Sequence, residues 1–361
     1  MKTTLAIVLL WTLCAGSATV ARAVCIGASV NSFGAKGDGH TDDTAAIQSA
    51  ISAASSAGGG SVVFGVARYF ITGTFVVPTG VVLCGVIEGP FDVAGFNPAV
   101  TTIAPTLLIT STNGPFITLQ GIGAGVTDLL FHYPNQVPTS ASMPTPYPYT
   151  ILVTAPGTKV ARSTVTNAYN FLDIEVGRTM AQDLFIGAFN TGVHIDHTAD
   201  RVTLRNLFNQ VFWDVLENVQ YPRPIDTWVL SHGTGLVVMR MDSLEIHDFF
   251  VFSRFTGILL TDSTDTSQAG ALCGYGAGSD VDLDTVQYGI VVTATNSPGF
   301  KFTNVDIGAA PGLGQAAVQV KTGGSMTPKI EINGTTQRGV WALGAYPTPP
   351  IGEEVIVNIL P

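Results

Sequence analysis

The chain has 361 residues, and its 26 acidic and 16 basic residues give a net charge of −10 at neutral pH. Hydrophobic residues make up 46% of it and charged residues only 12%. This is about half the usual ~25% charged residues, which excludes a disordered chain and a bundle of charged helices. Its 40 glycines favour a β-rich protein with many tight turns. The acidic balance argues against nucleic acid and anionic lipid as partners.

Residues 1–23 predict a secretory signal peptide. Lys2 supplies the positive start, an apolar run follows at residues 5–13, and Ala21-Arg22-Ala23 places small residues at a cleavage site. The run is shorter than the ~20 residues that a membrane span needs. We therefore expect a secreted protein, extracellular or periplasmic, with no membrane partner after cleavage near Ala23.

Three cysteines remain after removal of this segment: Cys25, Cys84 and Cys273. Their spacing matches no C-x-x-C metal or redox motif, and we predict no metal site. A disulfide between Cys25 and Cys84 and a set of buried free thiols are both open.

The segment that follows predicts an N-terminal cap. Asp42, Asp43 and Thr44 offer oxygens that accept hydrogen bonds at a helix start, and Ala45–Ile51 continue with the apolar spacing of a short helix. The glycines at residues 58–60 end this helix. Strands are then expected at Ser61–Phe64, Tyr69–Thr72 and Val81–Cys84.

A short phrase recurs further along the chain. It reads Asn-Thr-Gly-Val-His-Ile-Asp at residues 190–196 and returns, with glycine in third place, at residues 233–239, 255–261 and 287–293. The 43 positions from Gly192 to Gly235 fit two periods, with Trp213 and Asp214 midway. Short alternating strands at such spacing indicate stacked coils, because one coil cannot bury its own inward residues.

These patterns predict an all-β protein, a parallel β-helix with a short N-terminal capping helix. Its single domain spans residues 24–361. The parts expected are a cap at residues 24–60, coils at 61–320 and a C-terminal cap or tail at 321–361. The oligomeric state is left open.

The segment Asn31–Ile47 carries a long motif, F-G-A-x-G-D-G-x-T-D-D-T-x-A-I. It resembles the pectate-lyase superfamily, and most of all its rhamnogalacturonase/epimerase-like group, also called family-28-related glycosidases. The resemblance implies a right-handed, single-stranded, pectin-lyase-like β-helix and a carbohydrate ligand. It leaves the chemistry open, because hydrolases, lyases, epimerases and phage tail-spikes share this fold. The aspartates of the motif belong to the cap, and we interpret them as structural.

Four polar residues of two neighbouring coils are expected on one outward patch: Asp173, Glu175, His194 and Asp196. The register stacks Asp173 on His194 and Glu175 on Asp196, with strands ~4.8 Å apart. Crowded carboxylates repel one another, which raises at least one pKa and creates an acid and a base. We predict Asp196 or Asp173 as the general acid of glycosidic cleavage, and Asp214 or Glu175 as base or nucleophile. A merely solvated strand face is the alternative.

The sequence between residues 213 and 240 gathers groups that are typical of a sugar subsite, aromatic rings together with arginine. We expect His194 to tune the carboxylates, and we expect substrate contacts from the following residues: Trp213, Tyr221, Arg223, Trp228, His232 and Arg240. Packing roles for Trp213 and Trp228 are equally open.

The function expected is a secreted carbohydrate-active enzyme, a glycosidase that hydrolyses a polysaccharide or oligosaccharide without a cofactor. Polygalacturonase motifs are echoed only in part, and Asp214 and His232 are the residues that match. A polysaccharide lyase or uronate epimerase is a second possibility, with Ca²⁺ as cofactor and Arg205 or Arg240 as base. A non-catalytic polysaccharide-binding surface protein is a third.

Overall fold

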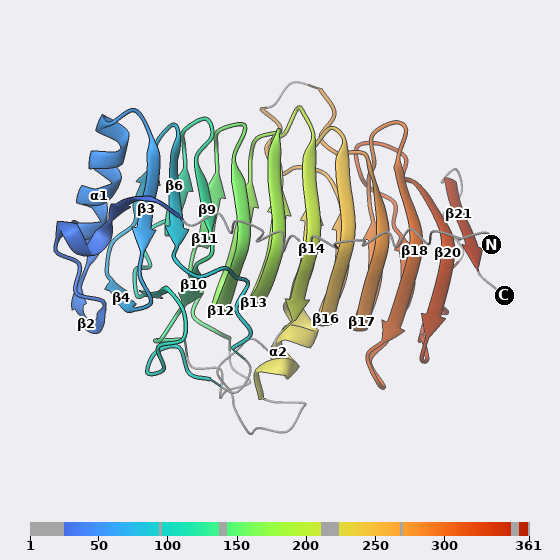
Figure 1. Cartoon of the computed structure of the whole chain (residues 1–361). Coiled ribbons are helices and arrows are strands. Elements are labelled where there is room, and N and C mark those ends of the chain that lie inside the picture. Colours follow the sequence, from blue (N-terminus) through green and yellow to red (C-terminus); the bar gives the residue numbers. More distant parts are fainter. Residues whose placement is uncertain are drawn as a thin grey trace, which may run out of the picture.

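The computed structural model describes residues 25–93, 96–136, 143–210, 224–267, 270–347 and 354–359. Its strands stack along one axis, with helix α1 (Thr44–Ser56) over one end and β21 (Glu354–Ile359) at the other (Figure 1). Every strand pairing in these ranges is parallel. The predicted parallel β-helix with an N-terminal helix is confirmed.

Short elements build the first coils: β1 (Gly27–Ser29), η1 (Val30–Phe33), β2 (Asp38–Asp42), β3 (Gly60–Phe64), β4 (Arg68–Ile71), β5 (Phe75–Val77), β6 (Val81–Gly85), β7 (Thr106–Ile109), β8 (Ile117–Leu119), β9 (Gly125–Thr127), β10 (Leu130–His132) and β11 (Tyr149–Val153). Longer strands follow: β12 (Lys159–Ile174), β13 (Thr179–Ile195), β14 (Val202–Gln210), β15 (Thr234–Val238), β16 (Leu244–Leu260), β17 (Gly276–Val292), β18 (Phe300–Ala309), β19 (Ala316–Val320) and β20 (Lys329–Arg338). A second helix, α2 (Pro224–His232), stands between β14 and β15. Inward residues from all coils join one main core cluster.

The long strands bend at single residues with a left-handed backbone. These bends occupy equivalent positions in successive coils: Asp183, Asn206, Asp248, Asp280 and Asn304. Asn and Asp tolerate this conformation because their short polar side chains hydrogen-bond locally. Here the amide of Asn206 donates to the carboxylate of Asp183 at 2.8 Å, and that of Asn304 donates to Asp280 at 2.6 Å. The bends let each strand wrap around the core without breaking its register.

The recurring glycine of the sequence phrase has a steric cause. Gly235 and Gly257 follow one another in register, as predicted. A Cβ atom on Gly235 would lie 2.6 Å from the carbonyl oxygen of Gly257 and 2.8 Å from a methyl group of Val251. A Cβ atom on Gly257 would likewise lie 2.7 Å from the carbonyl oxygen of Gly289. Glycine therefore permits the close approach of neighbouring coils at this corner.

The structure corrects two predictions: the number of coils between Gly192 and Gly235, and the residue at which the stacked strands end. Thr191 pairs directly with Thr234, so one coil, not two, separates Gly192 from Gly235. An insertion between β14 and β15 lengthens this coil. The insertion is about as long as one repeat, so the glycine spacing in the sequence suggested two coils. At the far end, β20 pairs with β18 and β21 pairs with β20. The stack of strands therefore continues beyond residue 320, where a cap or tail was predicted.

The motif aspartates hold the N-terminal end together. Asp43 is buried and accepts hydrogen bonds from the backbone N–H groups of Lys36 at 2.6 Å and Gly37 at 3.0 Å. Its side chain does not cap α1, contrary to the prediction. Asp42 instead accepts from the N–H of Thr44 at 3.0 Å. The structural interpretation of these aspartates fits their contacts.

A disulfide joins Cys25, just before β1, to Cys84 in β6, with a Cα–Cα distance of 6.2 Å. This selects one of the two alternatives that the sequence left open. Cys273 is buried and unpaired. Among the described residues, no helix has the length and apolar character needed to cross a membrane.

Candidate functional site

The predicted outward patch forms where β12 and β13 end side by side. Asp173 and His194 are paired in the strand register, and Nδ1 of His194 lies 2.6 Å from Oδ1 of Asp173. Their strand neighbours, including Leu172 and Val193, belong to the core cluster. The alternation therefore aims the polar pair away from the core, as the sequence predicted.

The Asp173–His194 pair is electrostatically coupled. Burial disfavours the charged imidazolium, because it removes water from it. The hydrogen bond and the charge of Asp173, helped by Asp196 and Glu175, outweigh burial and raise the pKa of His194 above its ordinary value. The pair thus carries a positive imidazolium against a carboxylate over a wider pH range than a free histidine would allow.

Glu175 is the acid of the patch that is biased toward its neutral form. Burial raises its pKa, the negative charges of Asp173 and Asp196 raise it further, and His197 and His194 oppose them. Its side chain is still 37% exposed. A carboxyl group that is both accessible and inclined to hold a proton is suited to proton donation.

Asp196 does not fit the general-acid role predicted for it. The residue is only 3% exposed. One carboxylate oxygen accepts from the backbone N–H groups of His197 at 2.8 Å and Arg240 at 3.1 Å. The other accepts from the hydroxyl of Ser263 at 2.7 Å. Asp196 is therefore buried and held by three donors, and it fixes the loop that carries Ser263 to the end of β13.

Two residues of the site, His197 and Asp265, were not among the predicted site residues. Nε2 of His197 lies 3.3 Å from Asp265 and 3.6 Å from Asp196, and its Nδ1 lies 3.9 Å from Glu175. His197 directly follows the strand phrase in a left-handed conformation, which alternation cannot predict. We call Asp173, Glu175, His194, Asp196, His197 and Asp265 the carboxylate cluster.

Tyr149 is a third residue that the sequence did not single out. Its ring centroid lies 6.0 Å from that of His194, and the two planes are tilted by 31°. Burial and the charge of Asp173 raise the pKa of its hydroxyl. Tyr149 begins β11 and pairs in register with Asn170 of the next coil. This register position is the only feature of the sequence that could have placed Tyr149 near the site.

The predicted aromatic subsite is only partly supported by the structure. Trp228 lies in α2, is 7% exposed, and stacks on the ring of His232 at 4.5 Å and 8°. It also contacts Tyr169 at 6.0 Å and joins a small core cluster. Trp228 is therefore a packing residue, because neighbouring rings cover it. His232 remains exposed at the end of α2.

Other predicted site residues can be placed only in part. The backbone N–H of Arg240 binds Asp196, and a Cβ atom on Gly270 would lie 3.5 Å from its guanidinium. Arg240 therefore lies beside the carboxylate cluster, beneath the loop that follows β16. Four more predicted residues lie outside the described ranges: Trp213, Asp214, Tyr221 and Arg223.

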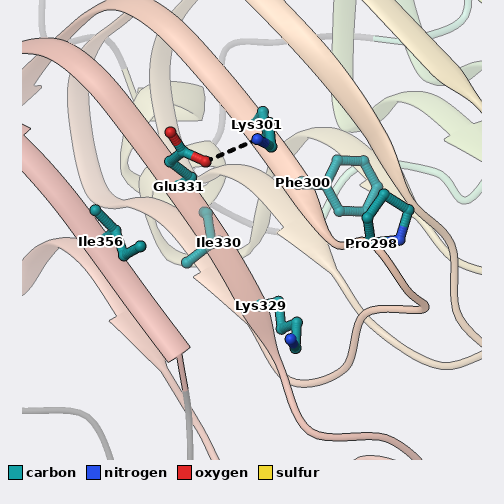
Figure 2. A pocket seen from close by; sticks show the side chains of 7 residues that line it. All are labelled: Pro298, Phe300, Lys301, Lys329, Ile330, Glu331 and Ile356. Atoms are coloured by element: carbon teal, nitrogen blue, oxygen red, sulfur yellow. Dashed lines mark ion pairs between the residues drawn. The ribbon is translucent and has the colours of Figure 1, made fainter.

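A cavity of about 210 Å³ lies elsewhere, where β18, β20 and β21 meet (Figure 2). Phe300, Ile330 and Ile356 supply apolar walls, and the Nζ of Lys301 pairs with Glu331 at 3.0 Å across it. None of the carboxylate cluster lines this cavity. The two features are therefore separate.

Comparison with protein families agrees with the N-terminal motif. Residues 27–100 match the family described as rhamnogalacturonase A/epimerase, pectate lyase-like, which confirms the superfamily resemblance. A stretch of 45 residues is 58% identical to alginate lyase 7 of Azotobacter vinelandii. That match covers 12% of this chain and 5% of the relative, so the chain spans a small part of the relative's length.

Solved structures resemble the chain over most of its length. An exopolygalacturonase from Thermotoga maritima aligns with a TM-score of 0.53 and 10% identity, over 88% of this chain and 83% of that chain. The enzymatically active domain of tailspike protein 2 from bacteriophage CBA120 aligns with a TM-score of 0.56 and 12% identity, over 86% of this chain and 43% of that chain. At these identities the likeness establishes the fold alone, a parallel β-helix.

Proposed function

We propose that this protein is an exported carbohydrate-active enzyme that hydrolyses glycosidic bonds of a polysaccharide. The observation that carries the proposal is the contrast between two neighbouring carboxyl groups on one outward patch. Glu175 has a raised pKa, whereas Asp173 is bound to the imidazole of His194. Glycoside hydrolysis uses such a pair, one protonated and one ionised. An exopolygalacturonase and the enzymatically active domain of a tailspike protein share this fold, which supports an enzyme of this class.

The roles follow from the two environments. Glu175 gives its proton to the leaving glycosidic oxygen as the glycosidic bond breaks. Asp173 accepts a proton from the water molecule whose oxygen forms the new bond to the anomeric carbon. His194 orients the carboxylate of Asp173 through the 2.6 Å contact. None of these steps needs a metal ion or another cofactor.

A second candidate, β-elimination or epimerisation at a uronate, is favoured by one contact. Tyr149 stands beside His194, and a tyrosine and a histidine in contact are a reasonable acid–base pair for removing and returning a proton at carbon. In that case Ca²⁺ would neutralise the substrate carboxylate, and a chelator would abolish activity. A hydrolase would be insensitive to the chelator.

The test is product analysis by mass spectrometry after incubation of the mature protein with a polysaccharide panel in ¹⁸O-labelled water. Hydrolysis adds one labelled oxygen per cut, whereas elimination adds none and leaves an unsaturated end. Glu175→Gln and Asp173→Asn should each reduce turnover by at least ~10²-fold. Glu331→Gln, a carboxylate in the separate cavity, is the matched control and should retain activity. Full activity in both cluster variants would overturn the assignment, and binding without any turnover would favour a non-catalytic protein.

A further inference from the structure

The Asp173–His194 pair belongs to a longer line of side chains, which we call the outward row. Strand pairing places its members one per coil: Leu152, Asp173, His194, Val237, Leu259 and Val291. The apolar members are absent from the main core cluster, whereas the residues on either side of Val237, Leu259 and Val291 belong to it. The row therefore runs parallel to the stack axis and faces away from the main core. Leu152, His194 and Leu259 are partly exposed, whereas Asp173, Val237 and Val291 are buried.

A polysaccharide lying along this row would meet apolar steps on both sides of the polar pair. Leu152 precedes the pair by one coil and Leu259 follows it by two coils, and these two are the partly exposed apolar members. Coils are ~4.8 Å apart, which is comparable to the length of one sugar unit. The apolar C–H faces of sugar rings can pack on such steps, and their hydroxyls can donate to the carboxylate of Asp173.

The row offers no cation that would receive a sugar carboxylate. Lysine and arginine are absent from its six described positions, and the imidazole of His194 is already bound to Asp173. Beside the row stand the further carboxylates of Glu175 and Asp265. Lys321, at the end of β19, places its Nζ 5.4 Å over the ring of Tyr288. Arg240 donates its backbone N–H to Asp196 and packs beneath the neighbouring loop.

These charges decide between two classes of polymer. A polyuronate carries one carboxylate per sugar, so several would face the apolar steps or the carboxylate cluster. Desolvating a carboxylate without a partner is costly, and repulsion between like charges acts over a Debye length of ~10 Å. A neutral polymer meets neither cost.

Building on the proposed function, we propose that the site takes a neutral polysaccharide, whose sugars carry no carboxylates, in preference to a polyuronate. The carboxylates then take part in the reaction and accept hydrogen bonds from the sugar hydroxyls, while the apolar side chains of the row pack against the sugar rings. The distinction concerns the substrate of this site and is independent of whether cleavage is hydrolytic.

The experiment uses matched polymers, a polyuronate and the neutral polymer obtained from it by carboxyl reduction, for galacturonate, mannuronate and glucuronate backbones. Binding is measured by affinity electrophoresis at low and at physiological salt. For at least one backbone the neutral member should bind at least tenfold more tightly at low salt, and the gap should narrow as salt screens the repulsion. Equal or tighter binding of the polyuronates, or no binding of any neutral member, would overturn the inference.

A charge substitution provides the internal control. Leu259→Lys places a cation on the outward row and should improve polyuronate binding at least tenfold, with circular dichroism checking the fold. Thr303→Lys adds the same charge at an exposed position on β18, outside the row, and should change little. If both variants gain polyuronate affinity equally, the net charge of the protein explains the preference, and an effect of the site is refuted. If a neutral polymer binds but is not cut, the proposed hydrolysis is refuted and the preference for neutral polymers is supported. If a polyuronate is preferred and is hydrolysed, the proposed hydrolysis is supported and the preference for neutral polymers is refuted.

Discussion

Stability should depend on pH through a carboxyl group far from the candidate site, Asp282 in β17. It pairs in register with Asp306, and its other charged neighbours are Asp284 and Arg338. The guanidinium of Arg338 lies 3.7 Å from Asp282, 3.6 Å from Asp284 and 2.9 Å from Asp306. One cation therefore serves three carboxylates. Burial and the charges of Asp306 and Asp284 raise the pKa of Asp282 from 3.8 to about 6.

The sign of the effect follows from proton linkage. The folded protein binds this proton more tightly than the unfolded chain, so the contribution to stability is complete below pH 3.8 and is lost as pH rises through about 6. A difference of about two pH units corresponds to about 3 kcal/mol at full strength. The side chain of Asp282 is 45% exposed, and solvent screening reduces the expected loss to about 1 kcal/mol.

The variant Asp282→Asn should remove this loss. We expect it to be about 1 kcal/mol more stable than the parent at pH 7.5 and equally stable near pH 4, measured by urea denaturation across that range. Asp280→Asn is the matched control, because the amide of Asn304 lowers the pKa of that exposed carboxyl and its loss should destabilise at neutral pH. An Asp282→Asn protein that is no more stable than the parent at pH 7.5 would refute the reasoning.

Three further predictions follow from the site and the coil packing. If Glu175 donates the proton, turnover should fall as pH rises through its raised pKa, and a rate profile that rises with pH in that range would contradict the role. Ser263→Ala removes a donor from buried Asp196 and should cost about 1–3 kcal/mol, seen as faster limited proteolysis of its loop. Gly257→Val brings a side chain against the Gly289 carbonyl and should lower stability by roughly 2–3 kcal/mol in thermal unfolding; an unchanged Tm would show that the coils can separate freely.

The sequence predicted the repeating part of the molecule because that part obeys local rules. Alternation with a period of two aims His194 outward, and the shared phrase sets its register against Asp173. A recurring glycine aligns Gly235 with Gly257 for the steric reason given above. None of these inferences needs information about distant segments.

The parts that failed depend on contacts between distant segments. Asp196 was expected in the open patch, but Ser263, 67 positions further along, covers it. The sequence left open whether Trp228 stacks on sugar or packs, because the helical turn that brings His232 against it has no signal in the local sequence. His197 and Asp265 meet only because that later loop returns to the coil. Such contacts leave no periodic trace in the sequence.

The insertion between β14 and β15 has a consequence for how such a chain can diverge. Thr191 still pairs with Thr234 across it, and Val202 at the start of β14 still pairs with Leu244 at the start of β16. Additional residues therefore leave the stack at one corner without shifting any pairing beneath them. The scaffold and its periphery are separable, so new segments can be gained, lost or exchanged at this rim while the strands that support Asp173 and His194 keep their places. A protein built in this way can acquire a different ligand by changing its border alone.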